Sequence, residues 1–167
     1  MGEDAAANAA LIDRFYEAFA RRDPDAMAAC YTADATFSDP VFQDLHGGEV
    51  TSMWRMLCER GTDLELRHGD VQADAERGSA HWDADYTFGA TGRKVHNEID
   101  SSFVFRDGLI AEHTDRFDLW KWTRQALGPV GVLLGWSPVV QGKVRGQARE
   151  RLDEFTAGEA AAGTSAA

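Results

Sequence analysis

Apolar and polar residues alternate along Leu109–Asp118, the stretch that follows the turn signal Asp107-Gly108. Two apolar runs that flank Asp-Gly predict a β-hairpin, and the side chains of a strand point alternately to its two faces. One face of the predicted strand is mostly apolar but carries His113 and Asp115. A buried charge needs a partner or a ligand, so this pattern favours the wall of a polar pocket over plain core. The opposite face is expected in solvent and consists of Ile110, Glu112, Thr114, Arg116 and Asp118.

The first third of the chain repeats its apolar residues at helical spacing. A first helix is predicted from Asn8, which is expected to cap it, and a short second helix from Asp23-Pro24. A third helix is predicted over residues 49–60, with Gly61 ending it. These helices bury the apolar stripes Leu11, Ile12, Phe15, Phe19 and Val50, Met53, Trp54, Leu57.

A short strand is predicted over residues 35–40, between the second and third helices, and Pro40 stops it. Phe37 must be buried, and alternation places Asp39 on the same inner face. The sequence therefore predicts a second inward carboxylate. The alternative left open is that Asp39 caps the turn before Pro40.

From Asp63 onward the period changes from helical to two, which predicts strands over residues 64–73, 80–88, 93–106 and 109–118. Helices threaded around one short strand and followed by a long antiparallel sheet indicate an α+β fold. Long twisted strands bend over the helices and form a cone-shaped α+β barrel with an open end, a natural small-molecule cavity. The inward faces of two strands hold Trp82, Ala84, Tyr86, Phe88 and Asn97, Ile99, Ser101, Phe103, Phe105.

After the last strand the pattern becomes helical again, with a break at Gly128-Pro129 and a restart at Ser137-Pro138. We expect one domain over residues 8–156, with a C-terminal helical extension from about residue 119, and a disordered low-complexity tail over 157–167. The extension should flank the mouth of the cone, because its apolar side chains need cover from the domain or from a partner subunit. These are Leu119, Trp120, Trp122, Val132, Leu133, Leu134 and Trp136.

The 167 residues include 17 basic and 28 acidic ones, for a net charge of -11. This charge argues against nucleic acid and against an anionic membrane as partners. The beginning of the chain has no basic or apolar signal region, and no apolar run approaches a membrane span, so a cytoplasmic protein is expected. Cys30 and Cys58 lie in helical patterns without metal-type spacing and fit small buried residues in a reduced compartment.

Five segments carry a family resemblance: YTADATFSDP at 31–40, HG at 46–47, TGR at 91–93, the F-x-F-x-D-G-L-I run at 103–110 and DRFD at 115–118. Together they resemble the nuclear transport factor 2-like superfamily, in its SnoaL-like branch of polyketide cyclases, ketosteroid isomerases and limonene epoxide hydrolases. The resemblance extends over about residues 8–120 and implies a homodimer as well as the cone. It does not imply one activity, because this superfamily contains isomerases, cyclases, dehydratases, hydrolases and binding proteins.

The resemblance places family roles on individual residues of this chain. The general base of ketosteroid isomerases corresponds to Asp39, and the aspartate in the last strand of the epoxide hydrolases corresponds to Asp115. The phenol that donates to the oxyanion falls at Phe15, with Tyr16 one residue away, and the second oxyanion donor falls at Ser101. Two of the three parts of isomerase chemistry are thus altered. The arginine of the epoxide hydrolases has no counterpart.

Asp39, His113 and Asp115 are therefore the candidate catalytic residues. His113 and Asp115 lie two apart on one face, near each other but not ideally placed to bond directly, and one would act as base with the other orienting it. The alternative is that His113 is a satisfied wall residue and Asp115 caps a backbone donor. No metal is expected. The candidate ligand-binding residues are Phe15, Tyr16, Trp54, Trp82, Tyr86, Asn97, Ser101, Phe103 and Phe117.

The leading hypothesis is a cofactor-independent enzyme, isomerase-, cyclase- or epoxide-hydrolase-like. It would act on a small hydrophobic polyketide-, terpenoid- or steroid-like substrate by acid–base chemistry in the cone cavity. The alternative is a non-catalytic small-molecule-binding protein of the same fold, and a third hypothesis is a protein-interaction domain. The expected partners are a small hydrophobic ligand and a second copy of the chain, with no nucleic acid and no membrane.

Overall fold

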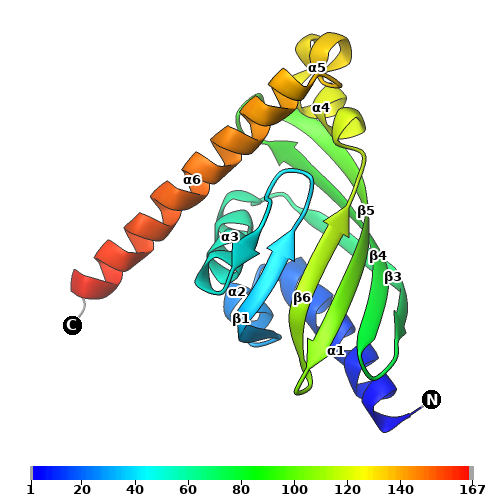
Figure 1. Cartoon of the computed structure of the whole chain (residues 1–167). Helices are drawn as coiled ribbons and strands as arrows, with labels where there is room; N and C mark the ends of the chain where they lie inside the picture. Colours follow the sequence, from blue (N-terminus) through cyan, green and yellow to red (C-terminus); the bar gives the residue numbers. More distant parts are fainter. Residues whose placement is uncertain (1, 166–167) are drawn as a thin grey trace.

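The computed structural model describes residues 2–165, and Figure 1 shows the course of the chain from the blue N-terminal helix to the red C-terminal one. Three helices surround the first two strands, four long strands follow, and three helices end the chain. The elements are α1 Glu3–Ala20, α2 Pro24–Ala28, β1 Tyr31–Ser38, β2 Leu45–His46, α3 Gly48–Arg60, β3 Glu65–Ala73, β4 Arg77–Phe88, β5 Arg93–Arg106, β6 Leu109–Arg116, α4 Leu119–Leu127, α5 Pro129–Leu134 and α6 Pro138–Ser165.

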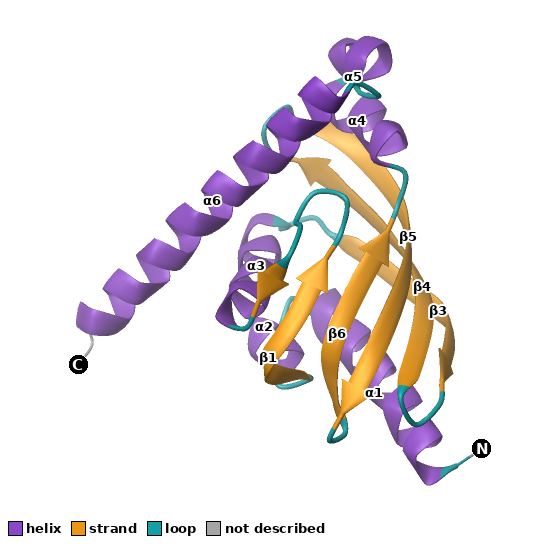
Figure 2. Cartoon of the chain, viewed as in Figure 1, coloured by secondary structure: helices purple, strands orange, loops and turns teal. Residues whose placement is uncertain are grey.

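The six strands form one sheet in the order β2-β1-β6-β5-β4-β3, and α1 to α3 pack against one face of it (Figure 2). This is the expected α+β cone, but the sheet stays open and does not close into a barrel. It is also not antiparallel throughout, because β1 pairs with β6 in parallel. The pairing places Phe37 beside His113 and so brings the first strand next to the last one.

The alternation predicted for the two long central strands is confirmed, because Ser101, Phe103, His113 and Asp115 are all buried. Ile110 is an exception, since it was expected in solvent and is fully buried. Its backbone N–H donates to the carbonyl of Cys30 at 2.9 Å, and the register between β5 and β6 shifts at this point. The neighbouring strand β1 thus covers a side chain that alternation alone turns outward.

Asn8 does not cap the first helix, which begins earlier, at Glu3. The side chain of Asn8 is buried in the middle of α1, and its Nδ2 donates to the carbonyl oxygens of Asp74 and Ala75 at 2.9 and 3.2 Å. It therefore fastens α1 to the turn between β3 and β4. The second helix begins as predicted, with the Asp23 carboxylate accepting from the backbone N–H of Ala26.

Helix α4 packs on β5 and builds a second, smaller hydrophobic cluster. Leu119, Trp122 and Ala126 are buried there against Val95, and the Asp118 carboxylate caps the helix. This part of the C-terminal extension is covered by the domain, as expected. The apolar side chains of α5 are not, since Leu133 is 70% exposed.

Helix α6 runs from Pro138 to Ser165, past residue 156, where the sequence analysis placed the end of the domain. It contacts α3, and Ser52 donates a hydrogen bond to Glu159 at 2.7 Å. The disorder expected for residues 157–167 stays a prediction, and residues 166–167 lie outside the described part. Among the described helices, none combines the length and the apolar character that crossing a membrane requires.

A chain truncated after Asp118 should melt at a clearly lower temperature than the full chain, or be insoluble. The truncation uncovers Val95, and each large apolar side chain that loses its burial contributes about 1.5–3 kcal/mol to the free energy of unfolding. Thermal melting followed by circular dichroism tests this. A chain that ends at Ala162 keeps these contacts and serves as the control. Identical melting curves for the truncated and full chains would contradict the prediction.

Candidate functional site

His113 and Asp115 form a direct hydrogen bond inside the cone. Both side chains are buried, and Nε2 of His113 lies 2.9 Å from Oδ1 of Asp115. The sequence analysis placed them near each other but not in position to bond. The imidazole is long enough to reach along the strand to a carboxylate two residues away, and this closes the gap.

The second ring nitrogen of His113 is held by Tyr31, which the sequence analysis did not select. Nδ1 of His113 lies 2.6 Å from the Tyr31 hydroxyl, and that hydroxyl accepts from Nε1 of Trp54 at 3.0 Å. An indole N–H can only donate, so the Tyr31 proton is free to point to Nδ1 of His113. A neutral His113 that carries its proton on Nε2 then satisfies every group in this chain.

A second branch reaches Asp115 through Ser101. The Ser101 hydroxyl donates to Oδ1 of Asp115 and accepts from the Tyr16 hydroxyl at 2.6 Å and from Nε1 of Trp82 at 3.0 Å. The two branches converge on one oxygen, so Asp115 accepts as an ionised carboxylate does. Burial raises the pKa of Tyr16 and Tyr31 well above the usual value, and the negative charge of Asp115 raises both further.

The residues of these two hydrogen-bond branches, called the deep cluster below, lie among packed aromatic rings. The centroid of the His113 ring lies 4.5 Å from that of Phe103 and 5.5 Å from that of Phe15, both buried side chains. Five of the aromatic residues predicted to bind a ligand thus belong to this packed interior: Phe15, Tyr16, Trp54, Trp82 and Phe103. The members of the deep cluster are Tyr16, Tyr31, Trp54, Trp82, Ser101, His113 and Asp115.

Asp39 lies one residue after β1, half-buried at the open end of the cone. Its Oδ1 accepts from the backbone N–H groups of Val41 and Phe42 at 2.6 and 2.5 Å, so it does cap the turn before Pro40. Burial raises its pKa to about 7, although the two N–H groups act in the opposite direction, and the charge of nearby Asp115 adds to the rise. Capping occupies only one oxygen. Among the described residues Oδ2 has no hydrogen-bond partner.

Like Asp39, the side chains of Tyr86, Asn97 and Phe117 are half-buried, and these four residues are called the mouth cluster below. The Tyr86 hydroxyl accepts from Nε1 of Trp122 at 2.7 Å, and burial raises its pKa to about 12, with the charge of Asp39 a lesser cause. Within residues 2–165 the Tyr86 proton and the Asn97 amide have no hydrogen-bond partner. Phe117 packs against both hydrophobic clusters.

A hollow of about 340 Å³ opens beside Tyr86 at the edge of the sheet. Its lining consists of Asp63, Glu65, Asp85, Tyr86, Lys94, Val95, His96 and Gln125.

Oδ2 of Asp115 has no hydrogen-bond partner, and no fully buried polar side-chain atom of the described residues lacks one. This oxygen therefore keeps some contact with accessible space.

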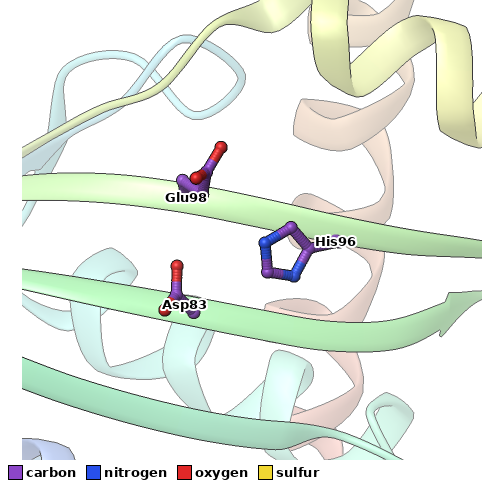
Figure 3. A group of neighbouring side chains, drawn as sticks. All are labelled: Asp83, His96 and Glu98. Carbon is purple, nitrogen blue, oxygen red and sulfur yellow. The ribbon is translucent and has the colours of Figure 1, made fainter.

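A separate group on the outer face of the sheet has metal-ligand character. One ligand atom from each of Asp83, His96 and Glu98 lies within 4.8 Å of the others, and Figure 3 shows one ring nitrogen of His96 facing the two carboxylates. The other nitrogen, Nδ1, bonds Asp85 at 2.8 Å. A histidine and two carboxylates suit a divalent cation. However, Glu98 is already paired with Lys121, and the group is open to solvent.

The comparisons with known proteins agree with this architecture. The sequence model of the SnoaL-like domain family matches residues 12–113. No curated protein sequence matches the chain. Among solved structures, a proposed polyketide cyclase from Xanthomonas campestris pv. campestris is similar, with 22% identity over 74% of this chain and 99% of that one and a TM-score of 0.64.

Two further structures show the range of proteins that share the fold. An LEH-like epoxide hydrolase from M. tuberculosis has 19% identity over 80% of this chain and 98% of that one, with a TM-score of 0.63. A hypothetical protein from Catenulispora acidiphila with a ketosteroid isomerase-like fold, in complex with trimethylamine, has 12% identity over 71% and 93%, with a TM-score of 0.62. At such identities the similarity establishes the fold alone.

Tyr31→Phe should destabilise the protein more than Tyr16→Phe. Removing the Tyr31 hydroxyl leaves Trp54 Nε1 and His113 Nδ1 unpaired in the core, at a cost of about 1–3 kcal/mol for each buried group. Ser101 keeps Trp82 as a donor when the Tyr16 hydroxyl is removed. Urea unfolding of the two variants measures the difference. Equal losses would contradict the expectation that the Tyr31 hydroxyl contributes more to the free energy of unfolding than the Tyr16 hydroxyl.

Asp39→Asn should make the folded protein more stable than wild type at pH 8. The pKa of Asp39 is about 7 in the folded chain, against about 4 in an unfolded one, so wild-type stability falls as pH rises between these values. The amide keeps the two backbone hydrogen bonds and has no charge to bury. The gain in the free energy of unfolding over wild type should be absent near pH 4. Above pH 7 it should reach at most about 1.4 kcal/mol per unit of pKa shift.

Chemical denaturation at several pH values tests this expectation. Asp44→Asn, on the same loop and exposed, is the matched control and should show no such pH dependence. A constant stability difference between Asp39→Asn and wild type from pH 4 to pH 8 would mean that Asp39 does not titrate as the structure indicates.

Proposed function

Because the chain belongs to the SnoaL-like domain family, we propose that it is a cofactor-independent enzyme that processes a small hydrophobic molecule by acid–base chemistry at the cone mouth. The observation that carries the proposal is Asp39, a half-buried carboxylate whose pKa is raised to about 7 and which has one oxygen free. A general base works best when its pKa lies near the operating pH.

Asp39 would take the proton in this reaction. Its Oδ2 accepts a proton from a carbon next to a carbonyl, or from a water that attacks the substrate, and the negative charge then develops on a substrate oxygen. Tyr86 and Asn97 supply the donors for that oxygen, since the Tyr86 proton and the Asn97 amide are unused within the described chain. The raised pKa of Tyr86 keeps its hydroxyl protonated at neutral pH. These donors stand in for the phenol and acid that the resemblance placed at Phe15 and Ser101.

The deep cluster would position and tune this base without touching the substrate. The ionised Asp115 raises the pKa of Asp39, and His113 and Ser101 hold Asp115 in its orientation. Asp115 is the second candidate base because its Oδ2 retains some accessibility. Asp39 is preferred because it is the more exposed of the two.

One observation favours the alternative of a non-catalytic binding protein. The residues around His113 are packed aromatic side chains, so a ligand cannot reach the His113 ring without displacing them. A protein whose deep cluster is purely structural would still hold a small apolar ligand at the mouth through Phe117, Tyr86 and Asn97.

A second copy of the chain remains part of this proposal. We propose that a homodimer forms through the outer face of the sheet, where the polar residues of β5 alternate with its buried ones. We also propose a cytoplasmic location. Cys30 and Cys58 are both buried and unpaired, which fits a reducing compartment.

The function is tested with a panel of apolar cyclic ketones and epoxides and the purified full chain. Hydrogen–deuterium exchange next to the carbonyl, and epoxide opening, are followed by NMR. The rate should rise with pH through about 7, since the base must be ionised, and Asp39→Asn should lower it by about 10²–10⁴-fold. Asp44→Asn is again the control and should keep full activity.

The same samples separate the two functions. Saturable binding of panel compounds without exchange or hydrolysis would reject the enzyme and support the binding protein. Turnover that persists in Asp39→Asn but is lost in Asp115→Asn would identify Asp115, and not Asp39, as the general base.

A further inference from the structure

The large apolar side chains that the protein exposes are gathered in one place. Among the described residues, all of them lie between positions 120 and 139, on α4, α5, the short connection after α5 and the first turn of α6. Leu133 is 70% exposed and Trp136 is 62% exposed. Figure 1 shows α5 at the end of the molecule, projecting from the sheet beyond α4. The apolar tip, as it is called below, consists of Trp120, Val130, Val132, Leu133, Leu134, Trp136 and Val139.

The charge of the same segment is opposite to that of the rest of the chain. Residues 119–149 contain five Lys and Arg and no Asp or Glu. The other 12 of the 17 basic residues and all 28 acidic residues lie elsewhere, so the segment has a charge of +5 and the remainder -16. The overall charge of -11, from which no membrane partner was expected, conceals this reversal.

Two of these cations are free for a partner. Among residues 2–165, neither Arg124 nor Lys143 forms an ion pair, and both are exposed. The guanidinium of Arg124 lies 4.5 Å from the ring centre of Trp120, so an aromatic ring and a cation are presented together on α4. Apolar side chains, tryptophans and unpaired cations on one short segment are the combination that peripheral proteins present to a bilayer.

We propose that the apolar tip docks on an anionic lipid surface. Leu133, Leu134 and Trp136 enter the boundary between headgroups and acyl chains, and Arg124 and Lys143 remain among the anionic headgroups. No spanning helix is required, because a short apolar segment with flanking cations lies in the interface. The acidic remainder of the chain keeps the body of the domain away from the membrane.

A second copy of the chain fits the tip less well. The described surface exposes no large apolar side chain outside the tip, so a partner copy offers only its own tip as an apolar surface. A tip-to-tip contact would also bring Arg124 of one copy, a cation that stacks on Trp120 of the tip and has no ion pair among the described residues, close to Arg124 of the other. The proposed dimer through the outer sheet face leaves the tip free, and the two proposals are independent.

The experiment is sedimentation of the full chain with phosphatidylcholine vesicles, prepared with and without phosphatidylglycerol. We expect binding to the anionic vesicles that weakens as salt is added. Leu133→Ser with Leu134→Ser should bind at least about tenfold more weakly, because two exposed leucines no longer enter the lipid. Arg124→Gln with Lys143→Gln should weaken binding to anionic vesicles and change no other property of the protein.

Matched controls come from the far side of the molecule. Ala10→Ser changes an exposed position on α1, and Arg21→Gln with Arg60→Gln removes two exposed cations outside the segment. Both should bind as wild type does. Melting curves confirm that all variants are folded, and light scattering gives their mass in solution.

Three results would overturn the proposal. The first is no sedimentation of the wild type with either kind of vesicle. The second is binding that is equal on neutral and anionic vesicles, or unchanged in the leucine variant. The third is a wild-type oligomer that the leucine variant dissociates, which would make the tip a contact between protein chains.

Discussion

The structure depends on one buried negative charge, the carboxylate of Asp115. Burying an ion without partners is prohibitively costly, and this chain meets the cost with two converging branches of hydrogen bonds. Trp54, Tyr31 and His113 form one branch, and Tyr16, Trp82 and Ser101 supply the other. The donors come from α1, α3, β1, β4, β5 and β6, so the elements that make the cone are held in register around a single oxygen. The same charge acts outward, where it helps to raise the pKa of Asp39.

Much of this arrangement follows from short-range patterns in the sequence. The period of two over residues 93–106 gave the bounds of β5, and alternation turned Ser101, His113 and Asp115 inward. The Asp39-Pro40 pair marked the end of β1, and the structure places that carboxylate at the mouth. These features are local, because they depend on the alternation of side chains and on turn chemistry, and a single strand carries both.

What the sequence did not show depends on contacts between distant segments. Tyr31 was missed because the predicted strand began at residue 35; extending the same alternation back four positions would have turned it inward with Phe37. Asn8 has the chemistry of a helix cap, but its partners are carbonyl groups 66 and 67 residues away. Ile110 is covered by a parallel neighbour that no pattern within its own strand reveals. The apolar residues of α5 were expected under cover, and their exposure depends on where α4 directs the chain.

Helix α4 has two neighbouring tryptophans with opposite surroundings. Trp122 points inward and donates to the hydroxyl of Tyr86, while Trp120 points outward beneath Arg124. The nine residues of α4 therefore carry one contact to Tyr86 inside and one exposed ring–cation pair outside. Any ligand that shifts α4 from outside therefore also changes the hydrogen bond at Tyr86, and a ligand that tightens that bond from inside favours one placement of the outer surface. If ligands bind at both places and both shift α4, linkage requires each to change the affinity for the other by the same free energy.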